Sequence, residues 1–416
     1  MVMGLVIVLI GCGGGPTSSM MPDPSPEPST GPPLSPALPA AAPSADHRLP
    51  TDVTLVNGSV YDIEPGDVVC LEPGTRPFLI IDGIVGRPGA PVTFTNCAGG
   101  TARIRGGDNF GLVLRASRHL RIQGSASPDG RFGLVIDGAQ RAKVGLSVDD
   151  RSSDVEVAFL EIKNTSFAGL MAKTDNANAG VAPSERFVLR NLHVHDLYVH
   201  DTAGEGMYLG STSVGPEQHL LDGLRVHDNV IARAGWDGLQ VSNATANAQV
   251  HHNVIYRGGA SGRENQANGL QISGNTAGSY HHNLIVGSHA LGVAVFGKGD
   301  LRIANNFIST SDGVFIDDRP GTVNGSPIRV VDNALRNIGT PFFRILNEKN
   351  AIFVENNRLD GAGKTTSIGG GAGGNVQVRG NESVRLRAVV FADPENDNFC
   401  LTTGSPYASM GLSNCR

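Results

Sequence analysis

His227-Asp-Asn-Val-Ile231 is the first of six related stretches that decide the fold of this chain. Each has an asparagine at its centre and a short apolar run after it. The other five read HHNVI (251–255), HHNLI (281–285), ANNFI (304–308), VDNAL (331–335) and ENNRL (355–359). The central asparagines are 24, 30, 23, 27 and 24 residues apart. A recurrence at this interval indicates a stack of similar structural repeats.

A second motif alternates with the first and consists of a glycine that opens another short apolar run. It reads GLSV (145–148), GLMA (169–172), GMYL (206–209), GLQV (238–241), GLQI (269–272), GVAV (292–295) and GVFI (313–316). Apolar residues at every second position predict strands and not a helix. Strands this short cannot bury their apolar face alone, so we expect successive repeats to stack as an all-β solenoid.

The repeats resemble the right-handed parallel β-helix family, which includes the pectate lyases and other polysaccharide lyases, over residues 52–390. In that family an asparagine recurs at the tight turn between the second and third sheets. Residues 61–75 and 86–94 look like the first coil of secreted members, and residues 391–406 look like their closing segment. The resemblance implies a right-handed three-sheet parallel β-helix of about ten coils. This domain would span residues 51–390, with a closing segment at 391–416.

The N-terminal region resembles an export signal followed by a spacer. Residues 1–12 form a short apolar run that ends in Gly11-Cys12 and resembles the lipobox of bacterial lipoproteins, in which the cysteine is acylated. The run departs from that pattern because no Lys or Arg precedes it. Residues 13–50 are rich in Pro, Ser and Ala and predict a disordered linker. We therefore expect an exported lipoprotein of the bacterial cell envelope, held at the outer membrane or cell surface through its lipid anchor only.

Charge and hydropathy argue against nucleic acid as the partner and against a membrane-spanning helix. The chain has 39 acidic and 33 basic residues and a net charge of −6, which argues against nucleic acid as the partner. No window reaches 18 consecutive apolar residues, so the sequence predicts no membrane-spanning helix.

Four of the five cysteines remain once Cys12 is assigned to lipidation. They form two sequence-local pairs, one toward each end of the solenoid, and an exported protein can oxidise them. We therefore expect the disulfides Cys70–Cys97 and Cys400–Cys415. A zinc site is the alternative, but no CxxC spacing or adjoining histidine accompanies these cysteines.

The resemblance places the glycine-led strands in the first sheet, with a polar strip along its outer side. The first and third residues after each glycine would point inward, while the second, the fourth and the residue before the glycine would line the strip. Insertions at 174–185, 210–222, 256–268 and 318–327 border the same strip, as expected for the walls of a binding groove. The alternative is that a solvent-facing strand carries polar residues in any case. The candidate catalytic residues are Tyr208, His200, Lys173, Glu205 and Asp237, and the candidate substrate-binding residues are Trp236, Gln240, Gln271, Asn268, Arg263 and Asp317.

The favoured function is a lyase or epimerase that acts on a uronic-acid-containing polysaccharide. Lys173, Gln240 or Gln271 would face the carboxylate, and Tyr208 or His200 would act as base and acid. The sequence departs from the known lyase signatures, since no Lys/Arg pair accompanies an acidic calcium cluster.

Two other functions remain open. A glycoside hydrolase would use Glu205 and Asp237, which occupy the same position on adjacent coils. A non-catalytic glycan-binding or adhesin-type surface lipoprotein would use the same groove without a reacting pair. All three functions share an extended polysaccharide as the partner.

Histidines form a further column. His195, His227, His251 and His281 align beside the asparagine turn on the outer side of the second sheet, and His252 and His282 follow two of them. A stacked histidine column can bind a metal, but later coils carry Ala304 and Glu355 at this position. We therefore favour a structural column. No metal or cofactor is predicted; Ca²⁺ is compatible with the fold, but no motif requires it.

Overall fold

The structure is a computed structural model that describes most of the chain after residue 37. The predicted signal, the lipidation site Cys12 and most of the predicted linker lie outside that part. No helix within the described part has the length and apolar character needed to cross a membrane. The described residues are 38–39, 42–58, 60–139, 141–174, 187–212, 219–296, 300–310, 312–318, 326–339, 341–369 and 371–415.

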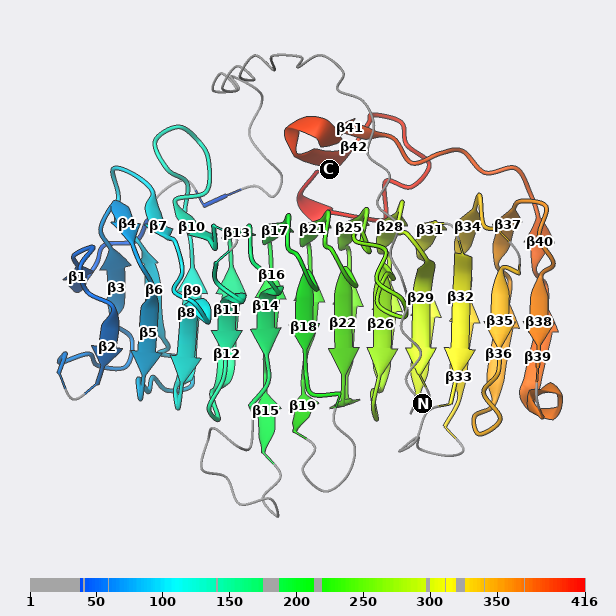
Figure 1. Ribbon diagram of the computed structural model, residues 1–416, viewed down its shortest axis with the longest axis horizontal. Helices are drawn as coiled ribbons and strands as arrows, with labels where there is room; N and C mark the ends of the chain where they lie inside the picture. Colours follow the sequence, from blue (N-terminus) through cyan, green and yellow to red (C-terminus); the bar gives the residue numbers. More distant parts are fainter. Residues whose placement is uncertain are drawn as a thin grey trace, which may run out of the picture. The chain divides into compact units, whose positions relative to one another are not determined.

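Three long parallel sheets form the body of the domain, and each coil adds one strand to each sheet (Figure 1). The first sheet contains β2 (Leu55–Asn57), β5 (Leu79–Asp82), β8 (Phe110–Arg115), β11 (Val144–Val148), β14 (Ala168–Ala172), β18 (Met207–Leu209), β22 (Leu239–Ser242), β26 (Leu270–Ser273), β29 (Leu291–Phe296), β32 (Asp312–Asp317), β35 (Phe343–Ile345) and β38 (Thr366–Ile368).

The second sheet follows the first within each coil. It contains β1 (His47–Leu49), β3 (Val68–Leu71), β6 (Val92–Asn96), β9 (Arg118–Gln123), β12 (Ser153–Ala158), β16 (His193–His195), β20 (Arg225–His227), β24 (Ala248–His251), β27 (Gly278–His281), β30 (Leu301–Ala304), β33 (Ile328–Val331), β36 (Ile352–Glu355) and β39 (Val376–Arg379).

The third sheet closes each coil. It contains β4 (Gly74–Arg76), β7 (Ala102–Ile104), β10 (Leu134–Asp137), β13 (Glu161–Lys163), β17 (Tyr198–His200), β21 (Val230–Ala232), β25 (Val254–Tyr256), β28 (Leu284–Val286), β31 (Phe307–Ser309), β34 (Ala334–Arg336), β37 (Arg358–Asp360) and β40 (Glu382–Ser383).

Shorter elements flank these sheets. A small parallel sheet of β15 (Val188–Arg190), β19 (Leu220–Asp222) and β23 (Ala244–Ala246) lies between first-sheet and second-sheet strands in the chain order. An antiparallel pair, β41 (Phe391–Asp393) and β42 (Asn398–Leu401), follows the last coil. Three short 3₁₀ turns complete the described elements: η1 (Ala372–Asn375), η2 (Pro394–Asn396) and η3 (Ser413–Cys415).

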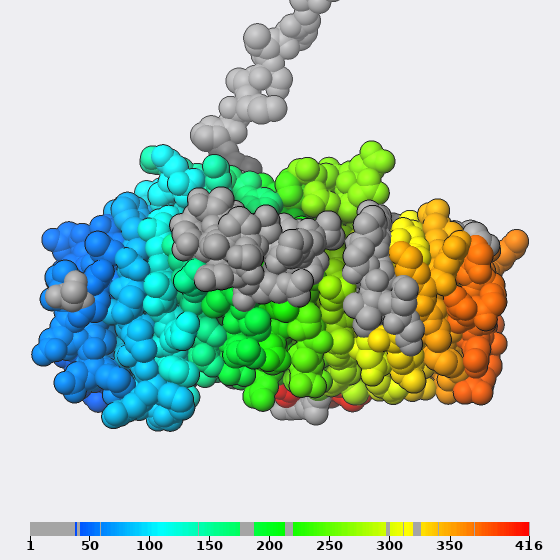
Figure 2. Space-filling model, turned by 90° about the horizontal axis from the view of Figure 1, so that it is seen from below, coloured from blue at the N-terminus to red at the C-terminus, as the bar shows by residue number. Residues whose placement is uncertain are grey.

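The predicted fold class, a three-sheet parallel β-helix, is confirmed. The coils follow one another in sequence order along the stack, which the space-filling view shows as successive bands of colour (Figure 2). The long sheets hold 12, 13 and 12 described strands, so the stack is longer than the predicted number of coils. The sheets also begin before the predicted boundary at residue 51, because β1 already pairs with β3.

Apolar side chains fill the interior of the solenoid as the glycine-led motif predicts. Leu239 and Val241 of β22 are fully buried, and so are the equivalent residues Met207 and Leu209 of β18. These residues pair in register with one another across the two strands. The period-2 pattern therefore stacks identical positions on top of one another and produces one continuous core.

A column of buried asparagines locks the turn between the second and third sheets. The Nδ2 of Asn283 donates to the Oδ1 of Asn306 at 2.9 Å, and the backbone amide of Asn283 donates to the same oxygen at 3.0 Å. The same pair of bonds recurs on every coil from Asn229 to Asn381. The predicted position of the asparagines is confirmed, and the sequence motif missed only the last member, Asn381.

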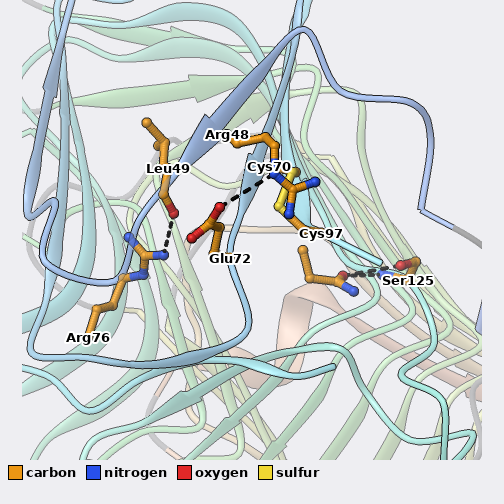
Figure 3. Close-up of a disulfide and its surroundings, with 8 residues drawn as sticks. Arg48, Leu49, Cys70, Glu72, Arg76, Cys97 and Ser125 are labelled. Atoms are coloured by element: carbon orange, nitrogen blue, oxygen red, sulfur yellow. Dashed lines mark hydrogen bonds and ion pairs between the residues drawn. A yellow bond between two sulfur atoms is a disulfide. The ribbon is translucent and has the colours of Figure 1, made fainter. Parts of the chain in front are cut away.

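Both predicted disulfides are present. Cys70 of β3 is bonded to Cys97 just after β6, so this bridge joins two neighbouring coils of the second sheet. Cys400 is bonded to Cys415 within the closing segment. Figure 3 shows the first bridge beside two further contacts of the first coils, the ion pair of Arg48 with Glu72 and the bond from Arg76 to a backbone carbonyl.

The buried guanidinium of Arg76 fastens the start of the solenoid. Arg76 is fully buried and donates to the backbone carbonyls of Leu49 at 3.2 Å, Pro50 at 3.2 Å and Val53 at 3.1 Å. A buried charge needs such partners because desolvation is costly. The guanidinium thus satisfies three carbonyls that lie beside the first strand.

The closing segment covers the outer face of the middle strands of the third sheet (Figure 1). Outward residues of the third sheet, among them Val230 and Val254, form a second apolar cluster with Phe391, Phe399 and Tyr407 of the segment. The outward residues of these third-sheet strands are therefore buried under the closing segment.

Candidate functional site

The predicted strip on the first sheet exists as a row of neighbouring side chains. Met171 pairs with Tyr208, Tyr208 with Gln240, and Gln240 with Gln271 across β14, β18, β22 and β26. Adjacent parallel strands lie about 4.8 Å apart. The structure therefore brings together residues that are about thirty positions apart in the sequence.

A second row runs beside it, formed by the residue that precedes each glycine. The amide of Gly206 donates to the carbonyl of Asp237 at 3.0 Å, and the amide of Gly238 donates to the carbonyl of Asn268 at 3.0 Å. Glu205, Asp237 and Asn268 consequently occupy equivalent positions on three consecutive coils. The predicted grouping of these three residues is confirmed.

Glu205 and Asp237 are buried carboxyls with incomplete hydrogen bonding. Their exposed fractions are 1% and 0%. The Oδ1 of Asp237 accepts from the backbone amide and from the Nδ2 of Asn268, both at 2.9 Å. The Oδ2 of Asp237 and the Oε2 of Glu205 have no partner among the described residues. Buried polar groups without partners are uncommon and concentrate at functional sites.

Both carboxyls titrate close to neutral pH. Burial raises the pKa of Asp237 to about 7, and the hydrogen bonds from Asn268 oppose that rise only in part. Burial also raises the pKa of Glu205 to about 7; the negative charge of Asp237 adds to the rise, while Arg263 and Lys173 oppose it. Two neighbouring acids with pKa values displaced in this way are typical of proton-transfer sites.

Aromatic rings border the carboxyl pair at the turn before the first sheet. Phe167 and Trp236 each lie two residues before a strand glycine, and their rings meet edge to face at 5.4 Å. Gly204 occupies the same position on the coil between them, where a Cβ would approach Phe167 to 2.8 Å. The missing side chain of Gly204 thus makes room for the ring contact. Phe167 was not among the candidate residues predicted from the sequence. Aligning the residues that stand two positions before each strand glycine would have identified it.

Two cations face aromatic rings in the same region. The guanidinium carbon of Arg263 lies 3.6 Å from the centroid of the Trp236 ring. The Nζ of Lys173 lies 5.0 Å from the centroid of the Tyr208 ring, and the hydroxyl of Tyr208 is hydrogen-bonded to the Oγ1 of Thr212 at 2.9 Å. Arg263 comes from the predicted insertion at 256–268, so this insertion does border the strip.

The two strip glutamines bind each other. The Nε2 of Gln271 donates to the Oε1 of Gln240 at 2.8 Å, and both side chains are buried. The pair continues the row of polar groups beyond Tyr208. The amide nitrogen of Gln271 and the amide oxygen of Gln240 are therefore engaged with the neighbouring coil.

The predicted place of His200 beside the strip is wrong. His200 ends β17 on the outer face of the third sheet, where it is 6% exposed and stacks on Tyr198 with centroids 3.9 Å apart. Its Nδ1 is bonded to Asp201 at 2.5 Å and its Nε2 to Glu161 at 3.1 Å. Tyr198 in turn donates to Asp397 of the closing segment. These partners hold His200 under the closing segment and away from the first-sheet strip.

Asp317 also lies apart from the carboxyl pair. It ends β32, and β29 separates that strand from β26. The Oδ1 of Asp317 accepts from the amide of Asp318 at 2.8 Å. Asp317 therefore belongs to the same sheet but not to the cluster around Glu205 and Asp237.

The histidine column is stacked as predicted. The rings of His195, His227, His251 and His281 lie 5.0 to 5.1 Å apart and nearly parallel. The Nδ1 atoms of His195 and His227 donate to the carboxylates of Asp196 and Asp228, at 2.7 and 2.8 Å. Those two aspartates also hold the closing segment, through Asn414 and Ser413. Within the described ranges, no group of three or more His, Cys, Asp or Glu residues has the arrangement of a metal site.

Comparisons with known proteins agree on the architecture. A family model described as "Right handed beta helix region" matches residues 222–383. No curated protein sequence matches the chain. Among solved structures, the GH136 lacto-N-biosidase from Eubacterium ramulus is 13% identical with a TM-score of 0.53, over 77% of this chain and 62% of that one.

A second solved structure covers more of both molecules. Pectate lyase Pel9A is 13% identical with a TM-score of 0.50, over 87% of this chain and 91% of that one. This chain spans less than two thirds of the length of the lacto-N-biosidase. At this level of identity the likeness concerns the fold, which is the right-handed parallel β-helix.

Proposed function

We propose that this right-handed parallel β-helix protein is a polysaccharide-active enzyme, a lyase or epimerase for a uronic-acid-containing chain. The observation that carries the proposal is the cluster around Glu205 and Asp237. Two carboxyls with a pKa of about 7 lie there, the charges of Lys173 and Arg263 act on Glu205, and Lys173 lies over the ring of Tyr208. The pectate lyase and the lacto-N-biosidase are both named for carbohydrate substrates, and this agrees with the substrate class.

The residues divide between binding the acidic sugar and moving its proton. Elimination or epimerisation requires that the uronate carboxylate be neutralised and that the C5 proton be removed. We assign the first task to Lys173 and Arg263, whose charges are directed to this strip. We assign the proton transfer to Tyr208, which is partly exposed beside Lys173.

The buried carboxyls act through their charge and not by contact with the sugar. Glu205 and Asp237 are too buried to touch a polymer directly. Their negative charge grows as the pH rises through 7, because both pKa values lie near 7. It holds Lys173 and Arg263 at the strip, so Glu205 and Asp237 are positioning residues in this mechanism.

The test uses purified protein with alginate, pectate and chondroitin. Elimination produces unsaturated ends that absorb near 235 nm, and epimerisation in D₂O places deuterium at C5 without chain cleavage. Tyr208→Phe should lower either rate by about 100-fold or more, with an unchanged melting temperature. Tyr61→Phe, outside the strip, is the matched control. An unchanged rate in Tyr208→Phe would remove this residue from the mechanism.

A glycoside hydrolase is the second candidate, because Glu205 and Asp237 occupy equivalent positions on adjacent coils and hydrolysis uses a pair of carboxyls. It ranks below elimination because the sugar would have to reach two carboxyls that are 1% and 0% exposed in this structure. New reducing ends without absorbance at 235 nm, lost in both Glu205→Gln and Asp237→Asn, would establish hydrolysis. Binding of a polysaccharide with no product of either kind would establish the non-catalytic alternative.

We also infer that the protein is exported and acylated on Cys12. The two disulfides support an oxidising compartment, and the resemblance of residues 1–12 to a lipobox supports the anchor. Mass spectrometry of the protein from membranes should find a diacylglyceryl Cys12 as the mature N-terminus. Cys12→Ser should release the protein from the membrane fraction, and retention of this variant there would refute the anchor.

A further inference from the structure

A hollow of about 300 Å³ lies on the outer face of the second sheet, away from the first-sheet strip. Its floor is a row of residues that pair across β9, β12, β16 and β20: Arg121 with Glu156, Glu156 with His193, and His193 with Arg225. Its wall is the loop 86–91, which precedes β6. A volume of this size is at the lower end for small-ligand sites and suits one sugar ring.

The wall is a fixed part of the fold. The amide of Gly86 donates to the carbonyl of Arg118 at 2.9 Å, and Arg87 and Ala90 exchange two backbone hydrogen bonds at 3.2 and 2.9 Å. A Cβ at Gly86 would come within 2.4 Å of the carbonyl of His119. Only glycine therefore lets the loop lie this close to β9, and the hollow is formed before any ligand arrives.

The acidic groups of the hollow are already satisfied. The Oδ1 of Asp154 accepts from Asn191 at 2.6 Å. Glu156 forms an ion pair with Arg121 at 3.1 Å and a bond to His195 at 3.4 Å. The hydrogen bond from His195 is the main reason why the pKa of Glu156 is lowered. Both carboxylates thus have donors that belong to the protein.

The positive groups of the hollow are not all satisfied. Arg87 and Arg225 are exposed and have no side-chain hydrogen bond or ion pair among the described residues. His193 adds no charge at neutral pH, because burial and the neighbouring histidines lower its pKa to about 4. The arginines and carboxylates of the lining sum to a charge of +1, and Arg87 and Arg225 are its two guanidinium groups without a carboxylate partner in the described part of the chain. Guanidinium groups bind carboxylates and sulfates in a bidentate manner. Pro88 and Pro91 supply apolar faces for the C–H side of a sugar ring.

We propose that this hollow is a second, non-catalytic binding site for an acidic sugar residue, held through its carboxylate or sulfate by Arg87 and Arg225. The site lies on a different sheet from Tyr208 and Lys173 and is independent of any reaction there. It would hold one part of an anionic glycan while another part occupies the first sheet. It therefore adds affinity for long chains through a second point of attachment.

The experiment compares Arg87→Gln/Arg225→Gln with Arg329→Gln. Arg329 is a partly exposed arginine of the same row, outside the hollow and paired with Asp300. Titration calorimetry with an oligouronate of defined length and with a neutral oligosaccharide of equal length gives the affinity, and hydrogen exchange locates the contact. We expect the oligouronate to protect residues 86–91 and 118–121, and the double variant to bind about tenfold more weakly at these residues. Arg329→Gln should bind as the parent protein does.

The proposal would be overturned by no protection of these residues, by equal binding of the double variant, or by equal binding of the neutral oligosaccharide. Titration with inorganic sulfate forms a further arm. If sulfate binds as tightly as the oligouronate does, the hollow is an anion site without sugar recognition and the proposal fails. Turnover of short substrates, measured separately, should be unchanged in the double variant, so failure of this site and failure of the proposed enzyme remain distinguishable.

Discussion

Asn268 donates both its backbone amide and its side-chain amide to a single oxygen, the Oδ1 of Asp237, at 2.9 Å each. The other carboxyl oxygen of Asp237 has no partner among the described residues. One half of the carboxyl is therefore anchored to the next coil, while the other half lies buried and unpaired. Burial of this carboxyl raises its pKa, and the bonds from Asn268 oppose the rise only in part; the first prediction follows from this.

Asp237→Asn should change the pH dependence of stability. The pKa of Asp237 is raised to about 7, so between pH 4 and 7 the folded protein keeps a proton that the unfolded chain releases. The free energy of unfolding therefore falls as the pH rises through this window. Relative to the parent protein, the variant should gain about 1 kcal/mol or more between pH 5 and pH 8. Urea unfolding at both pH values measures this, with the exposed Glu264→Gln as control; an equal pH dependence in the variant would contradict it.

The histidine column should make the protein sensitive to acid. Burial and neighbouring positive charge lower the pKa of His251 and His281 to about 4. Between pH 6.5 and 4 the unfolded chain therefore binds protons that the folded protein does not, and stability falls as the pH falls. His281→Gln should reduce this loss by up to about 1.4 kcal/mol per pH unit. Thermal unfolding from pH 7 to 4.5 gives the change of stability with pH. The control His289→Gln, at an exposed position, should not alter this change.

His195 should have the opposite effect on the pH dependence of stability from His251 and His281. Burial lowers its pKa, but the hydrogen bonds to Asp196 and Glu156 outweigh this and raise it to about 9. Its contribution to stability is complete below pH 6.5 and is lost as the pH rises through 9. His195→Gln should therefore cost stability at pH 6 and little at pH 10. Unfolding measured at both pH values decides this, and an equal cost at the two would show that the imidazolium contributes nothing.

Loss of one asparagine should break the column locally. The Oδ1 of Asn306 accepts twice from Asn283, and its Nδ2 donates to Asn333 and to the carbonyl of Tyr280. Asn306→Ala leaves several buried groups without partners, at a cost of about 1–3 kcal/mol for each. We expect a loss of about 3 kcal/mol or more in urea unfolding. The exposed Asn109→Ala is the control, and a loss no larger than in this control would refute the column as a source of stability.

The closing segment should loosen without its disulfide. Cys400 and Cys415 enclose a loop of 15 residues, for which loop entropy gives about 3 kcal/mol. Cys400→Ser/Cys415→Ser should increase hydrogen exchange in β41 and β42 and increase dye binding to the apolar face of the third sheet. The variant Cys70→Ser/Cys97→Ser, in the first coils, should change neither. Full retention of protection in β41 would show that the apolar contacts alone hold the segment.

The sequence was sufficient for features that repeat from coil to coil. The asparagine column, the inward apolar residues and the row of Glu205, Asp237 and Asn268 all follow from one period, because equivalent positions must stack. The two disulfides followed from pairs close in sequence. Features that recur on each coil of a solenoid can be predicted without knowing which segments cover its outer faces.

The features that the sequence did not predict depend on segments that do not repeat. His200 was misplaced because it lies under the closing segment, which returns from the C-terminus: Tyr198, on which His200 stacks, donates to Asp397, 199 residues further along the chain. The hollow beside Arg225 was missed because its wall, the loop 86–91, belongs to a much earlier coil. Such contacts between distant, unique segments leave no periodic signal in the sequence.

The closing segment is the last part of the chain to be synthesised, and this affects how the protein folds. The third-sheet strands that it covers are made well before β41 and β42 leave the ribosome. Until then, their apolar outer face is open to any other nonpolar surface in the cell, including that of a second nascent chain. Biogenesis of this protein therefore contains a vulnerable interval that ends only when its final residues arrive, and chaperone supply during that interval should limit the yield.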